Sequence, residues 1–387
     1  MVQSLLIQNV QILDLQTGES RYADIYIEKG IVKKIDREIF AKAQYVIDAK
    51  GFFAVPGLVD THSHLFYDTE LIGVDPRKYD LPNGVTYCID QGSAGADNYE
   101  EFRNRVLASV DVKVRSFLNC SRIGMPVSSL ADTGDIPGPG ELSVRSDFNR
   151  EAFIEVYQKY RKELLGIKIR MTPNICPENP LDALEKAIDI AEELNIRVSV
   201  HSNHALGVQT EDVLSRLRKG DIFTHTYHKG ETGILNEAGQ LKACVLDARE
   251  RGVIFDTGHG VNSLSFEVLE QAAKLGFFPD TISTDLHNLN VNGPVFDMPT
   301  TISKFLCVGM PLLDAMRCCI SNPVRLLGLE DKEISIREGS VADLAIFELK
   351  EGDYTYRDAM KKNLSGKYRL EARFTVTGES LFYHKWK

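Results

Sequence analysis

Eight short apolar runs, separated by stretches with helical spacing, limit the possible folds of this chain more than any other feature. Each run is short enough for one buried strand. The intervening segments 179–194 and 265–275 place apolar residues three and four positions apart, as amphipathic helices do. This alternation predicts a parallel sheet, and eight is the strand number of a (β/α)8 barrel. The predicted strands are 53–60, 85–90, 112–119, 166–169, 198–201, 222–225, 253–256 and 281–285.

Both flanks of this region follow another pattern. Before it, segments 5–10, 23–28 and 31–35 read as short strands of a small antiparallel sheet. After it, residues 312–327 predict one further helix, and 339–347 return to a strand pattern that could rejoin the first sheet. The segment 128–147, rich in Gly, Pro, Ser and Asp, predicts a long loop after the third barrel strand, on the face where barrel loops shape active sites.

Composition excludes several classes of protein. The chain has 387 residues, enough for one large barrel and a smaller domain, and its net charge is −10. No block of Lys and Arg is present to neutralise nucleic-acid phosphates. Neither a signal-peptide pattern nor a run of roughly 20 apolar residues occurs, so we expect a cytoplasmic protein without a membrane partner. The seven cysteines show no CxxC spacing and are expected to be free thiols.

Four histidines stand at the ends of predicted barrel strands. His62 and His64 are two residues apart beyond the first strand, so both side chains point to one face. His201 and His225 end the fifth and sixth strands. Barrel enzymes place their catalytic groups at the carboxyl ends of their strands. Imidazoles gathered there predict a site for divalent cations such as Zn²⁺.

An aspartate and a lysine extend this set. Asp285 ends the eighth strand, where a carboxylate can bind metal and exchange a proton with bound water; its alternative role is to cap the next turn. Lys168 lies within the fourth strand, where an inward ammonium would be desolvated and repelled by metal ions. A neutral amine there can react with carbon dioxide to give a carbamate, an anionic ligand able to bridge two ions. The alternative is a lysine that reaches solvent at the strand end.

Five further residues follow strand ends and are candidate contacts for a small-molecule substrate. Arg170 shares strand parity with Lys168, so it either binds a substrate carboxylate or forms a salt bridge at the barrel rim. His259 is flanked by glycines that permit close approach. The full set is Arg170, His228, His259, Asn262 and His287.

The order of these ligands along the strands resembles that of the binuclear amidohydrolase superfamily. Residues 54–64 (AVPGLVDTHSH) look like its signature, and 339–346 are similar to its closing strand, Gly-x-x-Ala-Asp. The resemblance implies an α/β fold in which a TIM barrel at 55–335 stands beside a β-sandwich formed by 1–54 and 336–387. It also implies two divalent metal ions, zinc being the first choice, N6-carboxylysine at Lys168, and a homo-oligomer.

Within that superfamily, segments 85–96, 283–287 and 299–306 are similar to a dihydroorotase-like branch of amidohydrolases and deacetylases. This resemblance implies hydrolysis of N-acyl amides or O-acyl esters, for example of acetylated hydroxy or amino acids. A bridging hydroxide would attack the carbonyl, and Asp285 would shuttle the proton. The implied metal ligands are His62, His64, Lys168, His201, His225 and Asp285.

Three alternatives remain at this point. A cyclic amidase of the dihydroorotase or hydantoinase type would use the same metals, but dihydroorotases carry an arginine soon after His-x-His, where this chain has Leu65-Phe66-Tyr67-Asp68. A mononuclear deaminase would not need Lys168. A non-catalytic assembly protein with the same fold typically loses metal ligands, whereas all six positions are filled here.

Overall fold

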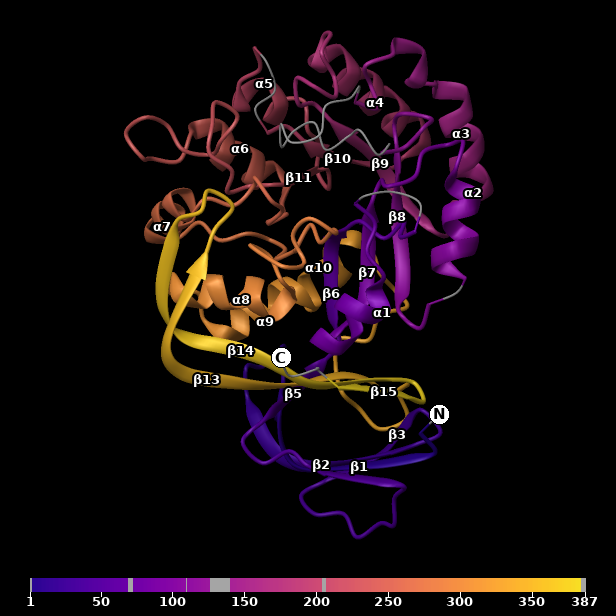
Figure 1. Ribbon diagram of the computed structural model, residues 1–387, viewed down its shortest axis with the longest axis vertical. Helices are drawn as coiled ribbons and strands as arrows, with labels where there is room; N and C mark the ends of the chain where they lie inside the picture. Colours follow the sequence, from indigo (N-terminus) through magenta and orange to yellow (C-terminus); the bar gives the residue numbers. More distant parts are fainter. Residues whose placement is uncertain (1, 69–71, 109, 126–139, 204–206, 384–387) are drawn as a thin grey trace.

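A seven-stranded parallel sheet forms the larger part of the molecule (Figure 1). The computed structural model describes residues 2–68, 72–108, 110–125, 140–203 and 207–383. The seven strands lie side by side in chain order, which confirms the predicted parallel arrangement. They are β6 (Leu58–Ser63), β7 (Val85–Gln91), β8 (Lys113–Asn119), β9 (Leu164–Arg170), β10 (Arg197–His201), β11 (Ile222–Phe223) and β12 (Ile254–Phe255).

The predicted eighth strand, 281–285, joins this sheet through isolated bridges. Thr281 forms a parallel bridge with Asp256 beyond β12, and Leu286 forms one with Ser63 of β6. Backbone N–H groups of residues 257, 259 and 260 also donate to the carbonyls of 281, 283 and 284. Both edges of the sheet therefore contact one segment, and the sheet is curled.

Helices connect the parallel strands and pack against them. In α4 the buried residues Leu184, Ala187, Ile188 and Ala191 recur at helical spacing, which explains why this helix was predictable. The helices of seven or more residues are α3 (Arg150–Lys159), α4 (Pro180–Leu194), α6 (Ala243–Arg251), α7 (Phe266–Lys274), α8 (Met298–Cys307), α9 (Leu312–Cys319) and α10 (Ser321–Leu327). Shorter ones are α1 (Pro76–Tyr79), α2 (Tyr99–Phe102) and α5 (Thr210–Leu214).

The prediction of one continuous helix over 312–327 was wrong. The structure ends α9 at Cys319 and begins α10 at Ser321, and Ile320 between them has a non-helical φ of −132°. Pro323 explains the break, because its ring would collide with the carbonyl of residue 319 and it has no N–H for that hydrogen bond.

An eight-stranded sheet forms the smaller part. Its order is β15-β14-β13-β5-β1-β2-β3, and β4 lies beside β1. Strand β13 pairs with β5, so the tail does rejoin the first sheet. The predicted strand 53–60 is divided at Gly57, with β5 in this sheet and β6 in the other. The strands are β1 (Ser4–Leu13), β2 (Ser20–Glu28), β3 (Ile31–Asp36), β4 (Tyr45–Asp48), β5 (Phe53–Pro56), β13 (Asp343–Arg357), β14 (Asn363–Thr377) and β15 (Ser380–Tyr383).

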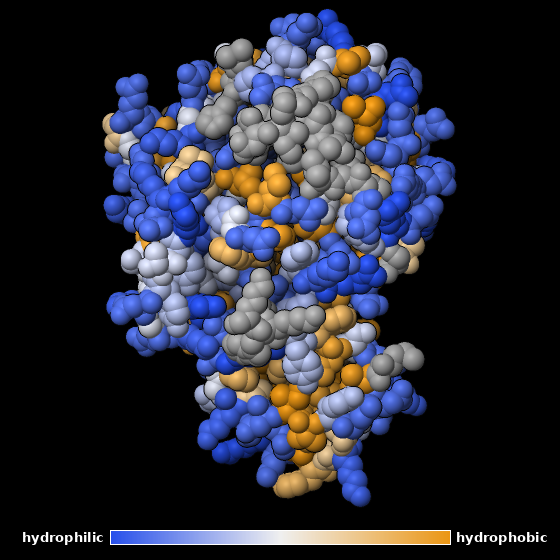
Figure 2. Space-filling model, in the orientation of Figure 1, coloured by the Kyte–Doolittle hydropathy of each residue, from blue (hydrophilic) through white to orange (hydrophobic). Residues whose placement is uncertain are grey.

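The surface and the loops add three observations. Figure 2 shows apolar side chains gathered on the lower part of the face in view, over the eight-stranded sheet. No helix among the described residues is long and apolar enough to cross a bilayer. Of the predicted loop 128–147, residues 128–139 lie outside the described residues, while 140–147 are irregular and end in a short 3-10 turn at Arg145–Asp147.

Candidate metal centre

His62, His64 and Asp285 meet where β6 contacts the segment 281–286. The two imidazoles are buried, with ring centroids 5.6 Å apart. Their Nε2 atoms lie 3.4 and 3.2 Å from Oδ1 of Asp285. Nitrogen and oxygen ligands of one tetrahedral Zn²⁺, each about 2.0–2.1 Å from the metal, stand about 3.3 Å apart. The three side chains therefore fit a divalent ion.

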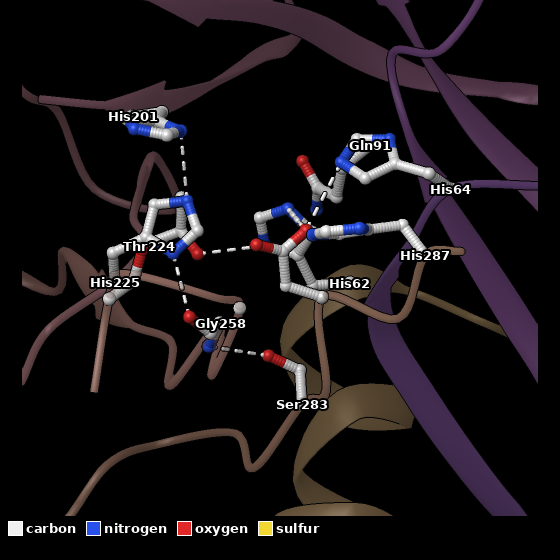
Figure 3. Close-up of polar contacts among 12 residues, drawn as sticks. His62, His64, Gln91, His201, Thr224, His225, Gly258, Ser283 and His287 are labelled. Carbon is white, nitrogen blue, oxygen red and sulfur yellow. Dashed lines mark hydrogen bonds and ion pairs between the residues drawn. The ribbon is translucent and has the colours of Figure 1, made fainter. Parts of the chain in front are cut away.

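His201 and His225 form a second pair beside this group (Figure 3). His225 donates its Nδ1–H to the carbonyl of Gly258 at 2.7 Å, which leaves the Nε2 lone pair facing Nδ1 of His201 at 3.0 Å. Burial lowers the pKa of both rings well below the ordinary value, so both are neutral. In the metal-free chain a proton on Nδ1 of His201 makes this contact an N–H···N hydrogen bond. With that proton on Nε2 instead, two nitrogen lone pairs would stand 3.0 Å apart, a spacing close to that of two nitrogen ligands of one metal ion.

Hydroxyl groups fix the orientation of the first two histidines. Thr224 donates its hydroxyl proton to Asp256 at 2.7 Å, so its oxygen accepts the Nδ1–H of His62 at 2.9 Å. Ser93 donates to Asp90 at 2.7 Å, and in the same way it accepts the Nδ1–H of His64 at 3.0 Å. Each ring keeps its Nε2 lone pair for a metal, as buried ligand histidines commonly do.

Lys168 of β9 is fully buried next to these groups. Its Nζ lies 3.4 Å from Oε1 of Gln91. Burial lowers the pKa of Lys168 to about 8; Arg170 contributes to this shift, and Asp285 opposes it. A Cβ on Gly92 would come within 2.6 Å of the Lys168 Cβ, and Gly92 has a φ of +75°, so glycine is required there. The chain thus makes room for an amine that loses its proton more readily than an ordinary lysine.

A pocket opens onto these groups. Three of the five predicted substrate contacts, Arg170, Asn262 and His287, line it. It is lined by His64, Ile72, Met125, Lys168, Arg170, His201, Val261, Asn262, Ser263, Asp285 and His287.

Comparison with known families identifies the family of this protein. The amidohydrolase family model matches residues 53–376. The chain belongs to the amidohydrolase family. As such it is an enzyme, a metal-dependent hydrolase acting on carbon–nitrogen bonds, and the resemblance read from the sequence is confirmed.

Several relatives match this amidohydrolase over nearly its whole length. A deacetylase of Agrobacterium fabrum is 31% identical over 378 residues, which cover 97% of this chain and 90% of the relative. The crystal structure of a dihydroorotase superposes with a TM-score of 0.87 and 29% identity, covering 98% of each chain. That of an adenine deaminase superposes with a TM-score of 0.86 and 28% identity, covering 98% of this chain and 99% of the other.

The remaining predicted contacts face the protein interior of this amidohydrolase. His228 uses one ring nitrogen on the carbonyl of His225 at 2.7 Å and the other on Thr232 at 2.9 Å. His259 likewise binds the carbonyl of Gly260 and the amine of Lys304. Neither ring lines the pocket.

Arg170 forms a salt bridge, one of the two roles considered from the sequence, and it also lines the pocket. It lies in the pocket wall, and its Nε and Nη2 each donate to the buried carboxylate of Glu141 at 2.7 Å. Glu141 was missed because nothing in a Gly- and Pro-rich loop marks the residue that turns inward.

Asp256 was also missed, although a signal was present. It ends the predicted strand 253–256, the position that identified the histidines. Asp256 accepts hydroxyl hydrogen bonds of 2.6–2.9 Å from Thr61, Thr224, Thr281 and Ser283. It therefore anchors Thr224 and, through it, His62.

Thr224→Val should lower metal affinity about 10- to 100-fold, because the hydroxyl that accepts the Nδ1–H of His62 is lost while side-chain volume is kept. Competition with a chromogenic chelator measures this. Thr257→Val is the matched control, since Thr257 donates to the carbonyl of Thr281 at 3.1 Å instead of holding a histidine. Equal metal affinity of the two variants would contradict the orienting role of Thr224.

Proposed function

We propose that this amidohydrolase is a binuclear enzyme that removes an acyl group from an N-acyl amide or O-acyl ester, such as an acetylated hydroxy or amino acid. The observation that carries the proposal is the convergence of two ligand groups on one buried lysine. Lys168 interacts electrostatically with Asp285 and His62 of the first group and with His225 of the second. The deacetylase relative supports an acyl substrate.

We further propose the closed architecture and the domain division. A closed eight-stranded barrel at 55–335 is supported by the bridges of 281–286 to both edges of the parallel sheet. A β-sandwich formed by 1–54 and 336–387 is supported by a separate apolar cluster between strands of these two segments. Its fully buried members include Leu5, Ile7, Val10, Ile25, Ala54, Leu344 and Ile346.

In this proposal His62, His64 and Asp285 would hold one divalent ion, and His201 and His225 would hold the other. The neutral amine of Lys168 would bond to carbon dioxide and release one proton, and the resulting carbamate would supply anionic oxygen ligands to both ions. The two ions, zinc being our first choice, supply an activated water and a Lewis acid for the substrate carbonyl.

Asp285 then moves the proton. Its carboxylate accepts a proton from the attacking water and returns it to the leaving nitrogen or oxygen. Burial raises the pKa of Asp285 to about 6 in the metal-free chain, which shows that this carboxylate sits where solvent does little to stabilise its charge. Asn262 and His287, which line the pocket, would contact the substrate.

Metal analysis and a substrate screen test the proposal together. We expect about two ions per chain and hydrolysis of N-acyl amino acids or acylated hydroxy acids that chelation abolishes. Folded protein that binds no metal and hydrolyses none of these would overturn the proposal.

A cyclic amidase is the second candidate, because a dihydroorotase superposes closely on this chain. Dihydroorotate and a hydantoin in the same screen separate the two, since ring opening without acyl hydrolysis would favour this candidate. A homo-oligomeric state and a cytoplasmic location stay predictions.

A further inference from the structure

Lys304 of α8 is a second buried lysine, and neither the metal centre nor the proposed reaction uses it. It is 1% exposed. Its Nζ lies 2.6 Å from Nε2 of His259 and 2.7 Å from the carbonyl oxygen of Pro294. Because His259 donates its Nδ1–H to the carbonyl of Gly260, its Nε2 is the acceptor for Lys304. Burial lowers the pKa of Lys304 to about 7, and a neutral amine still has an N–H for each acceptor.

The two acceptors belong to two segments that line the pocket. His259 begins the segment that contains Val261, Asn262 and Ser263, all of which line the pocket. Pro294 belongs to the connection between Asp285 and α8 that carries His287, another lining residue. One side chain thus connects two of the segments that line the pocket.

The segment 261–263 is held at its other end by the turn between β13 and β14. The backbone N–H of Ala359 donates to the carbonyl of Leu264 at 3.0 Å. The Phe266 N–H donates to the Asp358 carboxylate at 2.7 Å. Asp358 is 1% exposed and also accepts the N–H of Lys362. Residues 261–263 are therefore fixed on both sides, by Lys304 before them and by Asp358 after them.

Lys304 and Asp358 belong to two elements that pack against each other, α8 and the β13–β14 hairpin. The β13–β14 hairpin extends from the eight-stranded sheet along α8 towards α7 (Figure 1). The N–H of Leu370 in β14 donates to the hydroxyl of Ser303, the neighbour of Lys304, at 2.9 Å. A Cβ on Gly366 would lie 1.8 Å from Sγ of Cys307, so the hairpin and α8 are packed without a gap. The smaller sheet is thereby connected to the pocket wall.

We propose that Lys304 and Asp358 are positioning residues that hold the segment 261–263 at a fixed distance from the segment that carries His287 and so set substrate affinity. This inference rests on the proposed function, because it takes this pocket as the place of hydrolysis. Both residues act through the segments they anchor and touch no reacting atom.

Lys304→Met tests the first anchor, because methionine keeps most of the apolar stem and removes both N–H donors. We expect KM for the best substrate of the screen, whether acyl or cyclic, to rise about ten-fold or more, with unchanged metal content. Lys242→Met is the matched control. Lys242 likewise donates to two uncharged acceptors, the hydroxyl of Thr210 and the backbone carbonyl of Glu231, but it does not line the pocket.

Asp358→Ala tests the second anchor, and it keeps the inference testable if Lys304→Met does not fold. The alanine variant should raise KM, and Asp358→Asn should restore much of it, because an amide oxygen still accepts the Phe266 N–H. Wild-type KM in both Lys304→Met and Asp358→Ala would overturn the inference, whatever the change in Tm. Loss of the proposed function is distinct, because it appears in the wild-type screen.

Discussion

Asp285→Asn is expected to lower kcat by about 10³-fold while most metal binding is retained. The amide oxygen can still stand 3.2–3.4 Å from the Nε2 atoms of His62 and His64, as the carboxylate oxygen does. The amide cannot accept the proton of the attacking water, and a positioned acid or base contributes about 10²–10⁴-fold to catalysis. Steady-state kinetics and metal analysis of the same preparation measure both effects.

Asp297→Asn is the matched control for this substitution. Asp297 caps α8 by accepting the N–H of Thr300 at 2.8 Å, and asparagine caps helices equally well. This variant should keep the wild-type kcat. An Asp285→Asn enzyme that binds metal and keeps most of its kcat would remove the proton-transfer role of Asp285 and leave that residue as a ligand only.

The positions of the histidines were predictable because they depend on local pattern and one topological rule. Apolar runs marked the strands, and the carboxyl ends of neighbouring parallel strands meet on one side of a sheet. His62 stands near the end of β6, His201 ends β10 and His225 follows β11. The structure brings them into contact, with ring centroids 5.0 Å apart for His62 and His225 and 4.2 Å apart for His201 and His225.

The same rule could not predict which way a side chain turns after its strand has ended. His228 and His259 follow β11 and β12 as the metal-site histidines follow their strands, yet both rings bind inside the protein. The partner of His259 is 45 residues away on another helix. Such a contact depends on how two loops pack, and no periodic pattern in either segment reports it.

The smaller sheet was predicted only in part: the predicted strand 339–347 covers only the beginning of β13, and β14 and β15 were not predicted. The two strands of the β13–β14 hairpin have 15 residues each and change their burial pattern along their length. In β13 residues 344–347 are all buried, whereas residues 351–357 alternate, and β14 packs on α8. A register shift between Glu351 and Tyr354 further disturbs the alternation. A strand that changes surroundings along its length loses the two-residue period by which strands are recognised.

Lys168→Met should maintain or raise the stability of the metal-free chain and should lower the activity of the metal-loaded enzyme. Methionine fills a similar apolar space without an amine, and burying the Lys168 amine is unfavourable, as its lowered pKa shows. The metal-free variant should therefore be at least as stable as the metal-free wild type. If the proposed carbamate joins the two ligand groups, the loaded variant should bind about one ion per chain instead of two, and kcat should fall about 100-fold or more.

The dependence of metal binding on carbon dioxide distinguishes a carboxylated Lys168 from a lysine with a purely structural role. If Lys168 is carboxylated, removing bicarbonate during metal loading should lower the ion content of the wild type and leave that of Lys168→Met unchanged. Labelled ¹³C-bicarbonate should give a carbamate signal in the wild type alone. If Lys168→Met binds two ions per chain and keeps the wild-type kcat, the two histidine groups bind both ions and support catalysis without Lys168. A variant that binds one ion and whose metal-free fold is less stable would instead show that the amine stabilises the fold. Its hydrogen bond to Gln91 would then explain why the lysine is buried.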